Sequence, residues 1–180
     1  MPLIVAWLYR IVEEFMKLTN SDVEKIREEI EHRKLVVRKE ALEAVKEARA
    51  HGDLSENFEY HAAKKDKNKN ESRIRYLERI LKTATIISDE SKSDEVGLNN
   101  TVQVYFEEDD EIETFKIVST MRGDSVRGRI SNESPIGAAL MGHKVGDRVE
   151  IKVNDSYSYY VVIKSIENTG EEETDTIRSY

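Results

Sequence analysis

Two carboxylates lie one helical turn apart in the stretch Gly52-Asp53-Leu54-Ser55-Glu56-Asn57-Phe58-Glu59-Tyr60, and no other residues of the chain are better suited to chemistry. Asp53 and Glu56 could together hold a hard divalent cation such as Mg²⁺, which keeps several waters and takes other ligands from a phosphate-bearing partner. The D-x-x-E spacing is also that of a capping box, in which Gly52 ends one helix and Asp53 opens the next. The two interpretations are compatible, because a cap uses only one carboxylate lone pair.

Long charged segments with a helical apolar stripe flank this stretch on both sides. Upstream, the stripe steps by three or four through Val23, Ile26, Ile30, Arg33, Val37, Ala41, Ala44 and Ala48. Downstream, it continues through Ala63, Lys67, Asn70, Ile74, Leu77, Leu81 and Ala84. This is the seam spacing of a coiled coil. The seam is expected to be thickest at the base and to thin toward the tip to alanines and polar residues. We therefore expect one antiparallel hairpin over residues 19–87, with one arm running to about His51 and the other from about Ser55 to Thr85.

The arms of this hairpin are long for so small a protein. An arm of roughly 30 residues, rising about 1.5 Å per residue, forms a rod on the order of 45 Å long. A domain of this size cannot bury such a rod, so we expect the rod to reach into a partner. Asn20 or Ser21 is expected to cap the first arm, with Glu24 placed to complete a box with Ser21.

Basic residues cluster on the tip half and middle of the second arm: Lys64, Lys65, Lys67, Lys69, Arg73, Arg75 and Arg79. Surface lysines on a coiled coil are usually just solvated. The alternative is that they track an RNA backbone or the acidic rim of a channel. We name Lys64, Lys65, Lys67, Lys69 and Arg73 as the candidate basic patch.

The charge of the chain is unevenly distributed. Residues 17–88 hold 17 Lys and Arg against 14 Asp and Glu, whereas residues 89–180 hold 10 against 20, and the formal net charge is −8. A general nucleic-acid binder should be strongly basic, so we expect this chain to meet nucleic acid only inside a partner's complex. The absence of cysteine excludes disulfides and thiolate metal sites, as is typical of a reducing cytosol. The four histidines lack zinc-site spacing.

The hydrophobic period changes from helical to two in the second half. Residues 89–98 are interpreted as a linker. Strands are expected at 102–106, 114–118, 148–153 and 159–166, with a short helix opening at Ser134-Pro135 and ending near Gly142. The acidic residues 168–180 are expected to form a disordered tail.

Either Met16 is expected to be the true initiator, or residues 1–15 are expected to be a loosely attached extension. The alternative is an added helix that packs Trp7 and Ile11 on the body. Their apolar run is far shorter than the ~20 residues of a membrane span, and its flanks do not fit a signal peptide. No membrane association is therefore expected.

Two segments resemble a known family. Residues 50–64, AHGDLSENFEYHAAK, resemble the G-D-L-S-E-N-x-E-Y-x-A-A-K signature of the Gre-type transcript cleavage factors, the GreA/GreB family. Residues 134–147, SPIGAALMGHKVGD, resemble their S-P-x-G-x-A-L-x-G-x-x-x-G-D segment, and the resemblance covers about residues 16–167. Phe58 stands where the family usually has alanine, and Ala138 stands where a basic residue is common. Because it lies only two residues after Glu56, Phe58 is expected to be solvent-exposed in the free protein.

The resemblance implies an α+β protein with a coiled-coil hairpin at 16–88 and an FKBP-like domain with an antiparallel sheet at 99–167. It implies a monomeric cytoplasmic factor that binds bacterial RNA polymerase through its secondary channel and stimulates cleavage of nascent RNA in backtracked complexes. Asp53 and Glu56 would be the catalytic acids, holding a Mg²⁺ shared with the polymerase and not bound in the free protein. Gly52, Ser55, Asn57, Phe58 and Tyr60 would support the tip. The polymerase itself would cut, so this chain is not expected to be an enzyme.

Two other functions compete with this one. A Gre-like protein could occupy the channel and modulate or inhibit the polymerase without promoting cleavage. The intact pair of Asp53 and Glu56 argues against this, because an inhibitor needs neither. A prolyl isomerase or chaperone built on the FKBP-like half ranks last, because it needs an aromatic-lined pocket and this half contains no tryptophan.

Overall fold

The computed structural model describes residues 16–50, 57–88, 92, 94–172 and 175–178. The chain divides into two compact units. Of the described residues, the hairpin unit comprises Met16 and residues 23–50 and 57–84, and the sheet unit comprises residues 17–22 and those from Thr85 onward. The extension expected at residues 1–15 lies outside the described residues, and both interpretations of it stay predictions.

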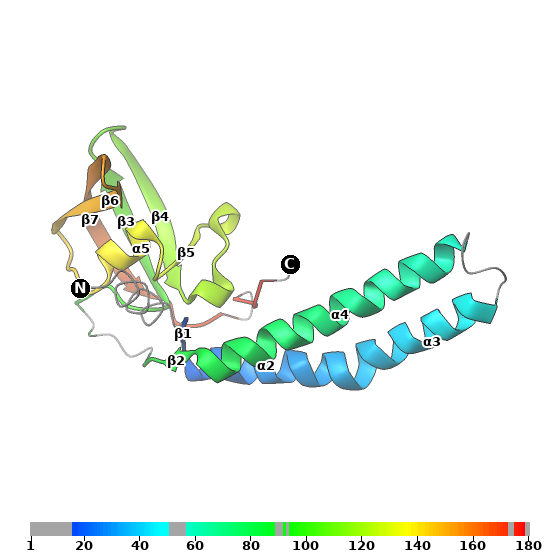
Figure 1. Ribbon diagram of the computed structural model, residues 1–180. Coiled ribbons are helices and arrows are strands. Elements are labelled where there is room, and N and C mark those ends of the chain that lie inside the picture. The colour runs from blue at the N-terminus through cyan, green and yellow to red at the C-terminus, as the bar shows by residue number, and fades with distance from the viewer. Residues whose placement is uncertain (1–15, 51–56, 89–91, 93, 173–174, 179–180) are drawn as a thin grey trace, which may run out of the picture. The chain divides into compact units, whose positions relative to one another are not determined.

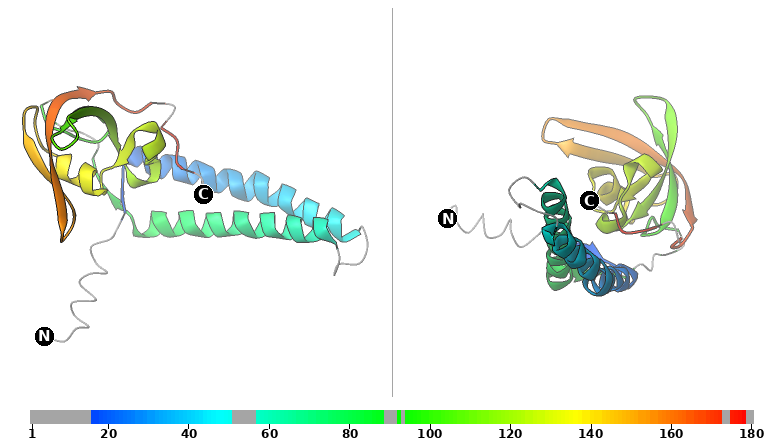
Figure 2. Two further views of the ribbon diagram at one scale, coloured as in Figure 1. Left: turned by 90° about the horizontal axis from the view of Figure 1, so that it is seen from above. Right: turned by 90° about the vertical axis from the view of Figure 1, so that its right-hand side faces the viewer.

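Two antiparallel helical arms form the hairpin unit (Figures 1 and 2). The first arm consists of α2 (Asn20–His32), the π-helical turn η1 (Arg33–Val37) and α3 (Arg38–Ala50), and the second arm is α4 (Phe58–Thr83). Apolar side chains are buried toward the base: Ile26, Ile30, Ile74, Leu77 and Ile80. On α3 the buried side chain is the small Ala48. The predicted hairpin, with a seam that thins toward the tip, is confirmed.

The arms are amphipathic, with most of their charged residues outside the seam. Although α4 is 26 residues long, none of the helices in the described parts of the chain combines the length and apolar character needed to cross a membrane.

The start of α2 differs from the prediction. Thr19 is the capping residue, because its Oγ1 accepts a hydrogen bond from the Asp22 amide at 3.1 Å, while the Asp22 carboxylate accepts one from the Thr19 amide at 2.9 Å. This reciprocal pair is a capping box with aspartate in the place of glutamate. The predicted caps at Asn20 or Ser21 and the predicted box with Glu24 are therefore wrong, because the helix begins two residues earlier than that box requires.

A five-stranded sheet forms the core of the sheet unit. Its strands are β3 (Asn100–Phe106), β4 (Glu111–Val118), β5 (Arg129–Ser131), β6 (Arg148–Asn154) and β7 (Tyr157–Asn168). They are arranged in the order β5-β4-β3-β7-β6. A separate two-stranded pair joins β1 (Lys17–Leu18) to β2 (Thr85–Ile86).

The five-stranded sheet is mixed, so the predicted antiparallel sheet is corrected. The pairs β3–β4, β3–β7 and β6–β7 are antiparallel, but β5 runs parallel to β4. After β4 the chain passes through the 3-10 turns η2 (Thr120–Arg122) and η3 (Ser125–Arg127). It then comes back along β4, so that β5 begins beside Lys116. This return gives β5 the same direction as β4.

The short helix α5 (Pro135–Leu140) begins at the predicted position. The Ser134 hydroxyl caps it by accepting a hydrogen bond from the Gly137 amide at 3.1 Å. A Cβ at Gly137 would lie 2.0 Å from the carbonyl oxygen of Ser131. Only glycine therefore allows α5 to approach the backbone at the end of β5 this closely.

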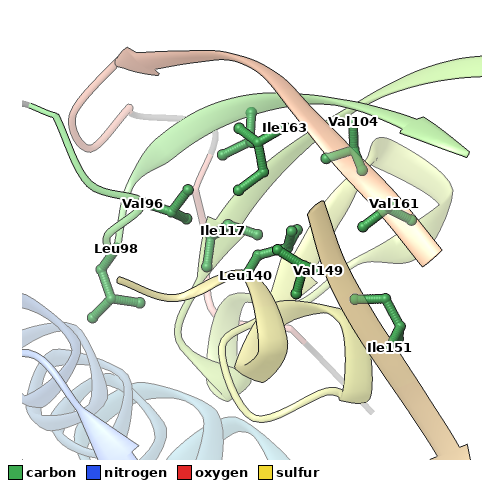
Figure 3. Packing of buried hydrophobic residues seen from close by; sticks show 10 residues of the cluster. Val96, Leu98, Val104, Ile117, Leu140, Val149, Ile151, Val161 and Ile163 are labelled. Carbon is green, nitrogen blue, oxygen red and sulfur yellow. The ribbon is translucent and has the colours of Figure 1, made fainter. Parts of the chain in front are cut away.

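The hydrophobic core of the sheet unit lies between α5 and the sheet (Figure 3). Its members are Val96, Leu98, Val102, Val104, Ile117, Leu140, Val149, Ile151, Val161 and Ile163. Val96 and Leu98 are 2% and 4% exposed. Residues 96–98 therefore belong to the core rather than to the linker predicted at 89–98, because their apolar side chains fill the space beside β3.

The end of the chain also packs on the sheet unit. The carboxylate of Asp175, which is 1% exposed, accepts hydrogen bonds from Lys116 at 2.7 Å and from Arg129 at 3.4 Å. The Arg178 amide donates to the carbonyl oxygen of Met121 at 3.0 Å. The disordered tail predicted at 168–180 is therefore wrong for residues 175–178, because ion pairs with the sheet compensate for their polar composition.

Candidate functional site

The tip of the hairpin unit carries the residues that the sequence singled out for chemistry. Gly52, Asp53, Ser55 and Glu56 lie outside the described residues, so their predicted roles stay predictions. The structure describes the two helix ends on either side of them. These ends fix where the intervening chain starts and finishes.

Asn57 joins the two arms at the tip. It is the N-cap of α4, and its Oδ1 accepts a hydrogen bond from the Tyr60 amide at 2.9 Å. Its Nδ2 donates to the carbonyl oxygen of Ala48 on α3 at 2.7 Å. The predicted capping box of Asp53 and Glu56 is therefore not the cap of α4. The helix begins later than the box predicts because Asn57, itself a strong capping residue, fills that role.

Tyr60 lies in a cationic environment on the first turn of α4. Its hydroxyl accepts a hydrogen bond from Arg49 at 3.4 Å, and the Arg49 guanidinium and the Lys64 ammonium lie 5.5 and 5.9 Å from its ring centroid. The hydrogen bond from Arg49, followed by the charges of Arg49, Lys64 and Lys67, lowers the pKa of Tyr60. Arg49 and Lys64 therefore place positive charge around Tyr60, and such charges attract phosphate.

Arg49 is a tip residue that sequence reasoning missed. It is the last basic residue before the tip on the first arm, and its contact with Tyr60 crosses from α3 to α4. Its position in the sequence, directly before the motif at residues 50–64, could have pointed to it. The hairpin brings Arg49 on the first arm next to Tyr60 of that motif on the second.

Phe58 is 89% exposed. It was predicted to be exposed because it follows Glu56 so closely, and this prediction is confirmed. A large apolar side chain left in water at the first position of α4 is available to contact a partner.

The candidate basic patch lies along α4. Lys64, Lys65 and Lys69 are exposed, and Lys67 is half-buried. These four lysines place positive charge along the second arm, behind Arg49 and Tyr60. Arg73, the fifth predicted member, is 7% exposed. It is not part of the exposed patch and is corrected to a seam residue.

Arg73 is drawn into the seam by a carboxylate on the other arm. Its Nε and one terminal nitrogen donate to the two oxygens of Glu29 at 2.9 and 3.0 Å. Arg33 donates to the same carboxylate at 2.7 Å. Burial acts to raise the pKa of Glu29, but the hydrogen bonds and charges of Arg73 and Arg33 outweigh it and hold that pKa below its usual value.

The polar seam continues one turn further at the π-helical turn η1. The Asn70 side chain accepts from Arg33 at 3.2 Å and donates to the Arg33 carbonyl oxygen at 3.3 Å. A π-helical turn disturbs the regular hydrogen bonds of a helix. Asn70 thus satisfies a main-chain group at the point where η1 begins, and its seam position, predicted from spacing, is confirmed by its 4% exposure.

Within the described residues, no cluster of three or more His, Asp or Glu side chains is arranged to hold a metal ion. The predicted cation ligands, Asp53 and Glu56, are outside that range.

Two models of known protein families match most of the chain. The family model described as "Transcription elongation factor, N-terminal" matches residues 16–86, and the one described as "Transcription elongation factor, GreA/GreB, C-term" matches residues 90–168. These matches cover the described hairpin and most of the sheet unit.

Curated relatives carry the name transcription elongation factor GreA. The protein from Mesomycoplasma hyopneumoniae strain J is 41% identical over 152 residues, covering 84% of this chain and 95% of the relative. Those from Clostridium acetobutylicum and Thermoanaerobacter pseudethanolicus are 43% and 46% identical, covering 81% and 76% of this chain and 93% and 87% of the relatives.

Among solved structures, GreA factor homolog 1 of Thermus thermophilus is 29% identical, with 86% of this chain and 99% of that chain covered and a TM-score of 0.39. This superposition is too weak to support an inference, so the assignment depends on sequence. The two family matches and the identity to full-length relatives agree. The chain belongs to the GreA/GreB family of transcription elongation factors.

Proposed function

We propose that this protein binds bacterial RNA polymerase, inserts its hairpin into the secondary channel and stimulates cleavage of nascent RNA in backtracked, arrested complexes. Family membership and the intact tip motif at residues 52–60 support this proposal. The observation that carries it furthest is the cap at Asn57. Because Asn57 caps α4, the start of that helix does not account for the two acids Asp53 and Glu56.

Asp53 and Glu56 fit a magnesium ion by the chemistry of their donor atoms. Carboxylate oxygens are hard ligands, and one or two carboxylates plus phosphate oxygens are the usual set for Mg²⁺. When bound, Mg²⁺ would lower the pKa of a water molecule and stabilise charge on the phosphate being cut. The role of this chain would be to supply two carboxylates at the end of a rod that reaches the polymerase active centre, where the polymerase supplies its own ligands. The polymerase would remain the enzyme that cuts.

The residues behind the tip would position RNA. Lys64, Lys65, Lys67 and Lys69 carry positive charge along α4, and Arg49, whose guanidinium lies at the Tyr60 ring, continues it at the tip. Lysine and arginine neutralise phosphates without reading base sequence. Such contacts would hold a backtracked RNA of any sequence, or the acidic wall of a channel. Phe58 would contact the channel wall or an RNA base.

Three finer expectations belong to the same proposal. The sheet unit would adopt an FKBP-like fold with a mixed sheet and would dock outside the channel. The protein would act as a monomer, because one channel admits one hairpin. Its partner acts on the chromosome, so the protein would be cytoplasmic.

The competing function is occupation of the channel without cleavage. RNA cleavage in a stalled, backtracked polymerase complex, with and without this protein, separates the two. Accelerated appearance of shortened RNA supports the proposal. Unchanged or slowed cleavage, together with binding to the polymerase, would establish the inhibitor instead.

A further inference from the structure

A cavity of about 120 Å³ at one end of the sheet unit is not used by the proposed function. Four aromatic rings and two carboxylates line it: Phe106, Glu108, Asp109, Tyr157, Tyr159 and Tyr160. Phe106, the last residue of β3, pairs with Val161 of β7. Residues 157–160 therefore run past the end of β3, beside the turn that joins β3 to β4.

The aromatic rings form a fixed floor. Phe106 and Tyr159 stack with centroids 5.9 Å apart and planes at 27°, and Tyr157 lies 6.0 Å from Tyr159. Phe106 and Tyr159 are half-buried against the hydrophobic core. Tyr157 is 49% exposed and forms the rim. The face of an aromatic ring carries negative electrostatic potential, so this floor favours a cation above it.

The turn beside the cavity is entirely acidic. Residues 107–111 are five consecutive carboxylates. The Tyr157 hydroxyl donates to Glu108 at 3.1 Å, and this bond raises the pKa of Tyr157. Within the described parts of the chain, Asp109 makes no ion pair. The cavity therefore combines an aromatic floor with a carboxylate that has no cation of its own.

The same end of the sheet already holds two cations of this chain on aromatic rings. The Arg148 guanidinium lies 3.7 Å from the centroid of Tyr160 and donates to both oxygens of Glu107 at 2.7 and 2.8 Å. The Lys164 ammonium lies 4.9 Å from the centroid of Tyr105. Next to the cavity, therefore, a basic head group already lies between an aromatic ring and a carboxylate. The residues that hold it come from the same strands and the same turn as those that line the cavity.

We propose that this cavity binds the side chain of a lysine or arginine from a basic segment of a partner protein. Its volume of about 120 Å³ suits one ammonium or guanidinium head group rather than a larger ligand. An aromatic-lined pocket is also what a prolyl isomerase requires, and the structure does contain one in this unit. A proline ring, however, gains nothing from Glu108 and Asp109, whereas a cation is attracted by both.

The test uses the full-length protein and four blocked pentapeptides that differ only at the central residue, flanked by glycines. The central residue is lysine, arginine, norleucine or proline. Ring and amide NMR signals of Phe106, Tyr157 and Tyr159 are followed as each peptide is added at low salt. The lysine and arginine peptides should shift these signals in a saturable way, and the norleucine and proline peptides should not. Equal shifts with norleucine or proline, or no shift with any peptide, would overturn the proposal.

Variants locate the binding. Glu108→Gln combined with Asp109→Asn should weaken binding of the lysine peptide about fivefold, as expected for two exposed charges. Tyr157→Leu should weaken it about threefold by removing one ring face. Glu111→Gln is the matched control, because Glu111 directly follows the acidic turn as the first residue of β4 but does not line the cavity. A loss with Glu111→Gln as large as that of the double variant would show general attraction to the turn and would contradict a site. Retained folding is checked on the same spectra.

Discussion

The carbonyl oxygen of Ala48 on the first arm accepts a hydrogen bond from Asn57 Nδ2 on the second, at 2.7 Å. The same side chain caps α4 through its Oδ1. One amide group thus starts a helix and ties it to the arm beside it. Asn57 therefore helps to fix the distance between the end of α3 and the start of α4, which residues 51–56 connect.

Changing Asn57 should separate these two roles. Asn57→Ala loses both bonds and should lower the free energy of unfolding by about 1–2 kcal/mol, the upper half of the range for a lost cap. Asn57→Asp keeps an acceptor for the Tyr60 amide but cannot donate to Ala48, so it should cost less stability. Thermal unfolding followed by circular dichroism measures both. Equal stability of wild type and Asn57→Ala would show that neither bond matters.

Arg73 and Lys69 should behave differently although both are basic residues of α4. Arg73→Met leaves Glu29 with one fewer charged donor and should destabilise the hairpin by about 2 kcal/mol, a value typical of hydrogen bonds to charged groups. Lys69→Met should change stability by less than about 0.5 kcal/mol and instead weaken binding to the polymerase complex. Denaturant unfolding and a binding titration check the two readouts. A stable Arg73→Met variant with weakened binding would restore Arg73 to the patch.

Acid should weaken the hairpin through Glu29. Its pKa is below the ordinary value of 4.5 in the folded protein, so the unfolded chain binds the proton more tightly. The ionised carboxylate therefore stabilises the folded state above pH 4.5, and this contribution is lost as the pH falls below 4.5 through the lower folded value. The difference in unfolding free energy between wild type and Glu29→Gln should shrink over that range. A difference independent of pH would contradict the assigned role.

Gly137 should tolerate no side chain. The Cβ of Gly137→Ala would meet the Ser131 carbonyl oxygen at 2.0 Å, and the forced shift should cost about 3 kcal/mol or more, the upper end of the range for overpacking. Gly123→Ala is the matched control, because its Cβ would find its nearest neighbour at 3.5 Å. Denaturant unfolding of the two variants gives the comparison. Similar stabilities would mean that α5 can move away from β5.

The hairpin could be predicted because its arms repeat an apolar step over many turns, and α5 could be predicted because serine, proline and glycine each have a specific local role. The burial of Arg73 could not, since it depends on Glu29, which lies 44 residues away in the chain. The parallel pairing of β5 could not be predicted for a similar reason. A strand of three residues is too short to show a hydrophobic period, and its direction is set by the turns that precede it. The packing of Asp175 likewise depends on basic residues of distant strands.

The cap of α4 was misassigned because two signals overlap in the sequence. The D-x-x-E spacing of Asp53 and Glu56 resembles a capping box, but Asn57 follows at once and is an equally good cap. Local propensity cannot choose between caps a few residues apart. The bond from Asn57 to Ala48 favours the later one, and this contact exists only once the arms are paired.

The central claim is that Asp53 and Glu56 hold a catalytic cation, and near-isosteric amides test it most directly. The measurement is the rate of RNA cleavage in a backtracked polymerase complex across a Mg²⁺ titration, with wild type, Asp53→Asn and Glu56→Gln. Both variants should fold normally by circular dichroism and still bind polymerase. Cleavage should fall about tenfold or more, since even the loss of a group that supports a metal ligand costs about that much. Added Mg²⁺ should restore part of it by mass action. Wild-type cleavage rates in both variants at every Mg²⁺ concentration would contradict the claim.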